Sequence, residues 1–213
     1  MDVAIAGGHG NVAMRLTRLL SERGDRVRSL IRNADHVGDV EAAGAEPVIC
    51  DMEAEDDLST FVAGSDAIVF AAGAGPGSGP ERKRTVDYGA AVKLIDAARK
   101  AGVTRYVMVS SIGAHDPSSG PQQMGPYLQA KHDADEALTD SGLAYTIVRP
   151  GSLNDDPGTG RVTVTDDMSV RGPVPREDVA AVLAAALADN STAGKTFVVV
   201  GGETPIDEAL RSL

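Results

Sequence analysis

Three side chains in the middle of the chain have the chemistry of an acid–base site. Tyr127 and Lys131 stand four residues apart in a predicted helix over 127–141, so they share one face of that helix. An ammonium group beside a phenol stabilises the phenolate and moves the phenol pKa, ordinarily about 10, towards neutral pH. Ser111 ends the preceding predicted strand, where it can hydrogen-bond a substrate carbonyl, and Ser110 is the alternative. Taken alone, the Tyr127–Lys131 spacing is also typical of a solvated surface pair.

A glycine turn near the start of the chain predicts a phosphate-binding site. The turn reads Gly7-Gly8-His9-Gly10-Asn11-Val12-Ala13, which is a Gly-x-x-Gly-x-x-Ala pattern. It follows the apolar run Val3–Ala6 and opens a helix with apolar residues at helical spacing, so backbone N–H groups at a helix N-terminus would face an anion. His9 would shape the turn or touch the pyrophosphate. The alternative interpretation is a plain tight turn.

The ends of the second and third predicted strands indicate which dinucleotide would bind. An NAD site usually has Asp or Glu at the end of the second strand, where it holds the ribose 2′-hydroxyl. This chain has Arg32 there, and an arginine can pair with a 2′-phosphate. The sequence therefore favours NADP(H) over NAD(H), with a solvated arginine as the alternative. Asp51 follows the third strand and suits an adenine amino group, although it could instead cap the next helix.

The elements that must position these residues alternate between strand and helix. Strands are predicted at Val3–Ala6, Val27–Ile31, Pro47–Cys50, Ala67–Ala71, Arg105–Ser110, Tyr145–Arg149 and Thr196–Val200. Helices are predicted after the glycine turn and at about 34–44, 55–63, 81–101, 127–141 and 176–189. Such alternation predicts an α/β fold, a doubly wound parallel sheet with helices on both faces.

The chain is expected to form one domain over residues 1–213, in which about residues 150–213 form a small substrate-side cap and the last strand. Stretches rich in Gly, Pro and Ser follow three of the strands, at Gly73–Pro80, Asp116–Pro126 and Pro150–Gly160. All three are expected at the carboxyl edge of the sheet, where ligands bind in open α/β folds. The first could cover a bound cofactor or be a plain connection.

Composition and charge exclude several classes of function. A formal net charge of −11 repels polyanions, so nucleic acid is not an expected partner. The apolar run Val179–Ala188 is about half the length needed to cross a bilayer, and no basic leader precedes the first strand, so no membrane is expected. A single cysteine, Cys50, indicates a reducing cytoplasm. The histidine spacing suits no metal. The expected partner is a small molecule, and a homodimer is left open.

Taken together, the motifs resemble those of the short-chain dehydrogenases/reductases. The residues that carry the resemblance occur in the order Gly7-x-x-Gly10-x-x-Ala13, Ala71-Ala72-Gly73, Val109-Ser110-Ser111, Tyr127-x-x-x-Lys131 and Arg149-Pro150-Gly151. The similarity is greatest to the atypical, single-domain NAD(P)H-binding branch, which includes flavin and biliverdin reductase-like enzymes and regulators of nitrogen metabolite repression. It covers nearly the whole chain and implies a Rossmann fold.

The resemblance also implies roles for individual residues. Cofactor contacts are implied at Gly7, His9, Gly10, Asn11, Val12, Arg32, Asp51, Met52, Ala71, Ala72, Gly73, Lys131, Pro150 and Gly151, and catalysis is implied for Ser111, Tyr127 and Lys131. Where related enzymes often carry a catalytic Asn, this chain has Val86-Asp87-Tyr88. The leading hypothesis is an NADPH-dependent oxidoreductase that acts on a carbonyl, a quinone or a related small molecule. A non-catalytic dinucleotide-binding sensor and a nucleotide-sugar epimerase or dehydratase are the alternatives.

Overall fold

The computed structural model describes residues 1–75 and 77–213. Pro76, part of the predicted loop Gly73–Pro80, lies outside the described residues. Within them, the main sheet has nine strands. Their spatial order is β11 (Thr204–Pro205), β8 (Arg161–Thr165), β10 (Lys195–Gly201), β6 (Ala144–Pro150), β5 (Arg105–Val109), β4 (Ala67–Phe70), β1 (Asp2–Ala6), β2 (Arg26–Ile31) and β3 (Glu46–Ile49). A small parallel pair, β7 (Ser152–Asn154) and β9 (Pro173–Pro175), lies beside this sheet.

The main sheet is parallel from β3 to β10, as the alternation of strand and helix predicts. Only at one edge does the direction change, where β8 runs antiparallel to β10 and to β11. The chain builds outward from β1 through β2 to β3 and then returns to the other side of β1 with β4. In doubly wound sheets this reversal opens a crevice at the carboxyl ends of the two central strands. The glycine turn after β1 lies at that place.

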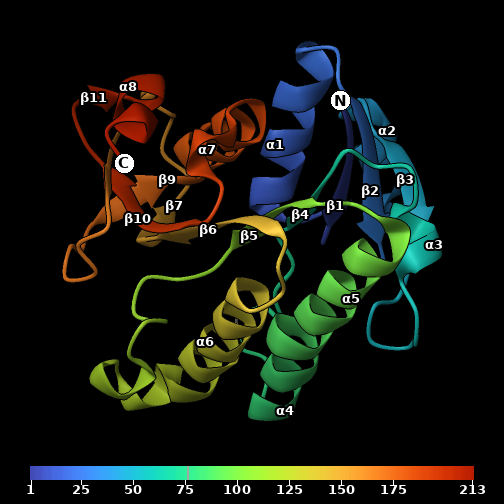
Figure 1. Ribbon diagram of the computed structural model, residues 1–213, viewed down its shortest axis with the longest axis horizontal. Coiled ribbons are helices and arrows are strands. Elements are labelled where there is room, and N and C mark those ends of the chain that lie inside the picture. Colours follow the sequence, from blue (N-terminus) through green and yellow to red (C-terminus); the bar gives the residue numbers. More distant parts are fainter. Residues whose placement is uncertain (76) are drawn as a thin grey trace.

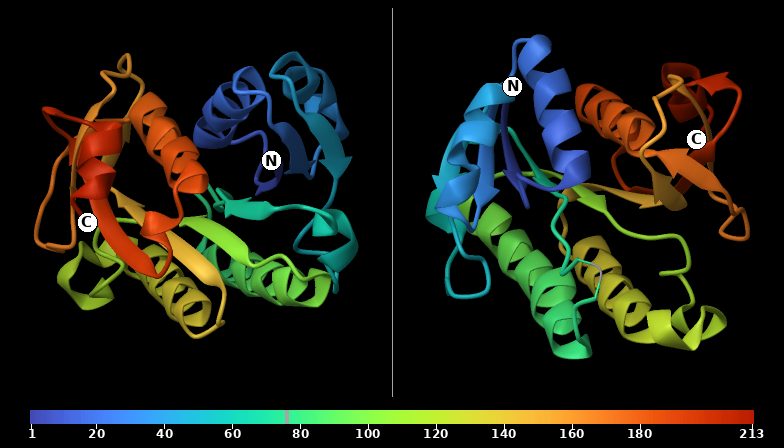
Figure 2. Two further views of the ribbon diagram at one scale, coloured as in Figure 1. Left: turned by 45° about the horizontal axis from the view of Figure 1, so that its top comes forward. Right: turned by 180° about the vertical axis from the view of Figure 1, so that it is seen from behind.

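Helices cover both faces of the sheet (Figure 1). One face carries α1 (Asn11–Glu22) and α7 (Arg176–Ala188), and the other carries α4 (Pro80–Arg82), η2 (Lys83–Ala90), α5 (Ala91–Ala101) and α6 (Gly125–Thr139). The shorter helices are η1 (Ala34–His36), α2 (Val37–Ala42), α3 (Ser59–Val62), η3 (Pro117–Ser119), η4 (Gln122–Met124), η5 (Asn190–Thr192) and α8 (Ile206–Arg211). Figure 2 shows the same layers from two further directions. The predicted doubly wound α/β fold is therefore confirmed.

Aliphatic side chains form a separate core on each face of the sheet. On α1, Val12, Leu16 and Leu20 form a buried stripe at helical spacing that faces the sheet and α7. Gly24 follows α1 with a φ of +89°, a conformation that favours glycine and ends the helix. The stripe thus fixes the direction of α1, whose N-terminus points at the crevice.

The predicted elements differ from the structure in two regions. The predicted helix over 55–63 is only α3, because the Asp57 carboxylate accepts the backbone N–H of Ser59 at 2.9 Å and the preceding acidic residues stay outside the helix. Residues 150–213 contain β7, β8, β9, β11, η5 and α8 in addition to the predicted last strand and helix. No helix in the described part of the chain is long and apolar enough to span a membrane.

Candidate functional site

The glycine turn packs so closely against neighbouring strands that side chains are excluded at Gly7 and Gly8. Gly7 has a φ of +77°, and a Cβ there would lie 2.6 Å from Ala72 Cα at the end of β4. A Cβ on Gly8 would lie 2.5 Å from Ser29 Cβ on β2. No side chain caps the N-terminus of α1, which begins directly after Gly10. The turn therefore presents uncapped backbone N–H groups at the positive end of a helix, which suits a pyrophosphate.

A cavity of about 830 Å³ runs from this turn along the carboxyl edge of the sheet. Of the residues predicted as site residues, it is lined by Gly10, Asn11, Val12, Ala71, Ala72, Gly73, Ser111, Tyr127, Lys131, Pro150 and Gly151. The ends of β1, β4, β5 and β6 and the first turns of α1 and α6 thus meet around one space. Its volume lies in the range of cofactor and ligand pockets.

Five residues predicted as cofactor contacts do not line this cavity, namely Gly7, His9, Arg32, Asp51 and Met52. Gly7 lies against Ala72 and allows the tight turn through its positive φ. The ring of His9 stacks on His36 with centroids 3.6 Å apart, and its Nε2 lies 2.9 Å from Asp39 Oδ2, so it faces α2.

Arg32 at the end of β2 is paired with a carboxylate that the sequence analysis did not single out. Its Nη1 lies 3.3 Å from Glu53 Oε2, and Arg82 Nη2 lies 3.2 Å from the same oxygen. Thr85 donates to the other Glu53 oxygen at 2.6 Å. Asp51 accepts the backbone N–H of Glu53 at 3.0 Å. A 2′-phosphate at Arg32 would therefore have to displace Glu53.

The two adjacent serines at the end of β5 have different partners. The buried Ser110 hydroxyl donates to Asp135 Oδ2 at 2.8 Å. The half-buried Ser111 hydroxyl donates only to the adjacent Ile112 carbonyl at 3.2 Å, a bond that a substrate oxygen can replace. Both serines border the cavity, but only Ser111 has a hydroxyl that is not held by a buried carboxylate.

Lys131 is buried and forms an ion pair with Asp87. Lys131 Nζ lies 3.3 Å from Asp87 Oδ1 and donates to the Val109 carbonyl at 3.1 Å. The other Asp87 oxygen accepts the Ala74 N–H at 3.2 Å. Asp87 lies on η2, a π-helical segment, and π-helical turns often occur at functional sites. From the sequence, Asp87 was noticeable only because related enzymes often carry a catalytic Asn there. Its ion pair with Lys131 could not be predicted from the sequence.

Tyr127 is half-buried in the cavity wall, one helical turn before Lys131. A second cation lies beside it: Lys83 Nζ is 5.4 Å from the centroid of the Tyr127 ring. The ammonium of Lys83 thus approaches the ring from η2, the element that also carries Asp87. The spacing of Tyr127 and Lys131 predicted one neighbouring cation, whereas Lys83 could not be found from spacing alone.

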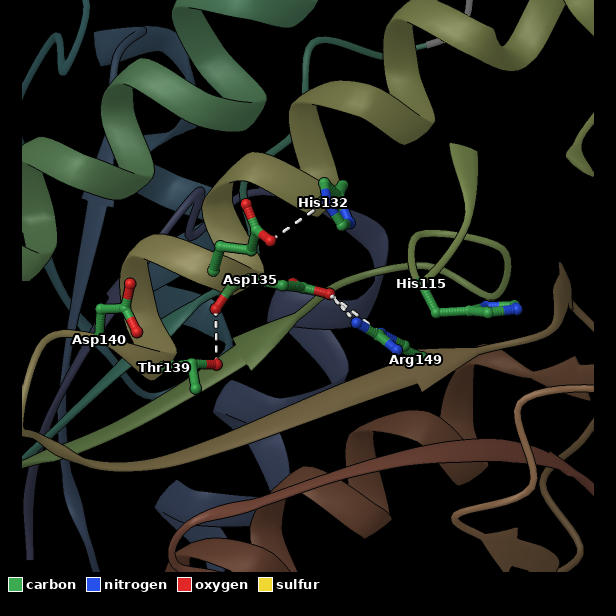
Figure 3. A pocket seen from close by; sticks show the side chains of 7 residues that line it. His115, His132, Asp135, Thr139, Asp140 and Arg149 are labelled. Atoms are coloured by element: carbon green, nitrogen blue, oxygen red, sulfur yellow. Dashed lines mark hydrogen bonds and ion pairs between the residues drawn. The ribbon is translucent and has the colours of Figure 1, made fainter. Parts of the chain in front are cut away.

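A second, smaller pocket of about 450 Å³ lies between α6 and Arg149 of β6, with His115 also in its wall (Figure 3). Asp135 and Arg149 point toward one another there, with Arg149 Nε and Nη2 each 2.9 Å from Asp135 Oδ2. Burial raises the pKa of Asp135, against the opposing effect of Arg149 and Ser110. Burial and the guanidinium groups of Arg149 and Arg171 lower the pKa of His115. The Asp135–Arg149 ion pair holds the Ser110 hydroxyl, which donates to Asp135, and thereby fixes the end of β5.

Taken together, these features define a dinucleotide-binding domain of the Rossmann fold. The sheet order, the tightly packed glycine turn at the crevice and the uncapped helix all fit a pyrophosphate-linked cofactor. A model of the NAD(P)H-binding family matches residues 7–190. The chain belongs to this NAD(P)H-binding family of oxidoreductases. The resemblance to the atypical branch of the short-chain dehydrogenases/reductases is confirmed.

Three similar proteins match this chain over their full length or nearly so. The chain is 39% identical over 215 residues to "Uncharacterized sugar epimerase YhfK" of Bacillus subtilis, with 100% of both chains covered. A solved structure described as a putative NAD-dependent epimerase/dehydratase from Bacillus halodurans is 40% identical, with a TM-score of 0.95 and 100% of both chains covered. The oxidoreductase ylbE from Lactococcus lactis is 31% identical, with a TM-score of 0.89 over 100% of this chain and 96% of that one.

Proposed function

We propose that the protein is an NADPH-dependent oxidoreductase that reduces a carbonyl or quinone group of a small molecule. The observation that carries the proposal is the single cavity that joins the first turn of α1 to Ser111, Tyr127 and Lys131. The family supplies the cofactor class, and the Lactococcus lactis relative is described as an oxidoreductase.

In the proposed mechanism, a bound nicotinamide supplies a hydride. Tyr127 donates a proton to the substrate oxygen, so that hydride and proton together convert a carbonyl into an alcohol. Ser111 donates a hydrogen bond to the same oxygen and orients it. Lys131 holds the ribose, with Asp87 fixing its ammonium group at 3.3 Å. Because Asp87 offsets the charge of Lys131, Lys83 over the Tyr127 ring is the cation that supports the phenolate after proton transfer.

The test of this mechanism is NADPH oxidation with a panel of carbonyl and quinone substrates. Tyr127→Phe removes the proposed acid, and we expect the turnover number to fall about 100-fold, since general acid catalysis contributes about that much or more. Tyr145→Phe, at a half-buried tyrosine outside the cavity, is the matched control and should leave turnover unchanged. Unchanged turnover in Tyr127→Phe would refute the assignment.

The preference for NADPH over NADH rests on Arg32. Its guanidinium can pair with a 2′-phosphate, which competes with Glu53 for it. We expect the wild-type chain to bind NADPH about tenfold more tightly than NADH, and Arg32→Ala to lose most of that difference, because one charge-assisted contact is worth about 1.5–3 kcal/mol. Fluorescence titration with both dinucleotides measures it. Equal affinities in the wild type would contradict the proposal.

A second candidate function is epimerase or dehydratase chemistry on a nucleotide sugar. It is favoured by the names of the two relatives that are 39% and 40% identical, a sugar epimerase and an NAD-dependent epimerase/dehydratase. The same assay separates it from the first, because an epimerase returns the hydride and consumes no NADPH. The sensor alternative predicts dinucleotide binding with no turnover on either class of substrate.

A further inference from the structure

The charges that line the large cavity are unlike those of the molecule as a whole. Among the described residues, the charged side chains in its wall are Lys83, Lys131, Arg171, Arg176 and Asp87. The chain carries a formal charge of −11, so this excess of cations is local. Two of them already have carboxylate partners: Lys131 pairs with Asp87 at 3.3 Å, and Arg176 Nη1 lies 3.0 Å from Asp155 Oδ2.

The other two cations, Lys83 and Arg171, form no ion pair within residues 1–75 and 77–213. Arg171 Nη1 donates to the backbone carbonyls of Met168 at 2.6 Å and Val170 at 2.9 Å, which holds the guanidinium in place while neutralising none of its charge. Lys83 lies over the ring of Tyr127, at the expected reaction centre. A cation that lines a cavity without a counter-ion favours an anionic ligand there.

Apolar side chains flank these cations at the cavity. Met124 and Leu153 are among the large hydrophobic side chains that stay exposed, at 41% and 37%. Both line the cavity, Met124 from η4 just before α6 and Leu153 from β7. Exposed apolar groups that gather at a pocket, rather than singly on the surface, indicate contact with an apolar ligand.

The cofactor phosphates have other partners in the wall. The uncapped first turn of α1 faces the pyrophosphate position, and Arg176 begins α7, which packs against α1. Lys83 instead comes from η2 beside Tyr127, and Arg171 comes from the segment between β8 and β9. These two cations therefore remain for the second ligand of the cavity.

We propose that the substrate is an apolar ring compound that carries an anionic group, a carboxylate or a sulfonate. Arg171 binds the anionic group, Lys83 adds a second positive charge to the same cavity from its place over the Tyr127 ring, and Met124 and Leu153 contact the apolar body. The inference rests on the proposed function for the reaction itself, but the binding of such a molecule does not require turnover. The proposed reaction and the proposed anion site can therefore be refuted separately.

The experiment compares a matched pair of fluorescent probes, anilinonaphthalene sulfonate and neutral phenylnaphthylamine, titrated into the full chain with saturating NADP⁺ present. We expect Arg171→Gln and Lys83→Gln each to weaken binding of the sulfonate about tenfold, because each removes a positive charge from the cavity, and to leave the neutral probe within about twofold. Arg171→Lys keeps the charge and should retain most of the affinity.

Arg211→Gln is the control, since it removes an exposed cation of α8 outside the cavity and should change neither titration. The proposal is overturned when both cavity variants bind the sulfonate as the wild type does, or when they lose the neutral probe equally. A naphthoquinone and its sulfonate, assayed with NADPH, then report on the reaction. Failure to reduce either quinone counts against the proposed function, whereas the probe titrations decide the anion site.

Discussion

The ion pair between Lys131 and Asp87 determines what this site can do at the scale of single residues. Both side chains are almost fully buried, at 3% and 1% exposed, and their charged atoms lie 3.3 Å apart. A buried ion pair is costly to form but far more costly to break, because the remaining charge has no water around it. Lys131 is therefore a positioned group with a balanced charge, and Lys83 is a cation beside Tyr127 that forms no ion pair with any residue the structure describes.

A double-mutant cycle tests this balance. Lys131→Met leaves the Asp87 carboxylate buried and uncompensated, so we expect it to lower the free energy of unfolding by about 3–5 kcal/mol. Lys131→Met combined with Asp87→Asn removes both charges and keeps an acceptor for the Ala74 N–H, so most of that loss should be recovered. Urea unfolding at neutral pH measures the free energy of unfolding of the wild type, of Lys131→Met and Asp87→Asn alone, and of the double variant. A double variant as unstable as the sum of its single variants would show that the pair is not coupled.

At the scale of elements, the glycine turn joins β1 to α1 with no space for a side chain at Gly7 or Gly8. Its tightness comes from two contacts at once, with the end of β4 at Ala72 and with β2 at Ser29. The same closeness allows a cofactor to approach the backbone of the turn. Shape and binding therefore depend on the same residues.

Gly7→Ala tests the close contact between Gly7 and Ala72, with Gly24→Ala as its matched control. Both glycines have positive φ, +77° and +89°, but a Cβ at Gly24 meets nothing within 4 Å whereas one at Gly7 overlaps Ala72. We expect Gly24→Ala to cost about 1 kcal/mol of stability, from backbone strain, with dinucleotide binding intact. Gly7→Ala should cost more and abolish binding. Thermal unfolding and NADPH titration measure the two effects, and equal behaviour of the two variants would contradict the role of the contact.

Most of the sheet could be predicted because its inner strands are buried on both sides and read as continuous apolar runs, such as Ala67–Phe70. The strand Arg161–Thr165 differs from these runs because it alternates Val with Arg and Thr: it lies next to the edge strand β11, where only one face is covered. The pairing of Arg32 and Arg82 with Glu53 could not be predicted, since these residues come from different elements. Whether Ser110 or Ser111 is held by Asp135 likewise depends on how α6 packs against β5.

At the scale of the whole molecule, stability depends on pH. His115, which lines the second pocket, contributes to this dependence. Burial, Arg149 and Arg171 lower the pKa of His115 from 6.5, so the folded state favours the neutral imidazole. Unfolding lets the ring take up a proton more readily. The contribution of His115 to stability is therefore fully present above pH 6.5 and declines as the pH falls towards its lowered folded-state pKa.

His115→Asn removes this titration. We expect the variant to lose less stability than the wild type between neutral pH and about pH 5, the range in which an unfolded histidine, of pKa about 6.5, takes up its proton. Urea unfolding at several pH values measures the difference in slope. Parallel curves for the two proteins would contradict the assigned role.

Both outermost strands of the main sheet are short and contain a proline. The strand β3 has four residues and includes Pro47, and β11 has two and ends at Pro205. A proline has no backbone N–H, so neither rim offers an unbroken ladder to an approaching strand, although Ile49 on β3 is 51% exposed. Both edges therefore disfavour edge-to-edge pairing with a strand of another copy of the chain.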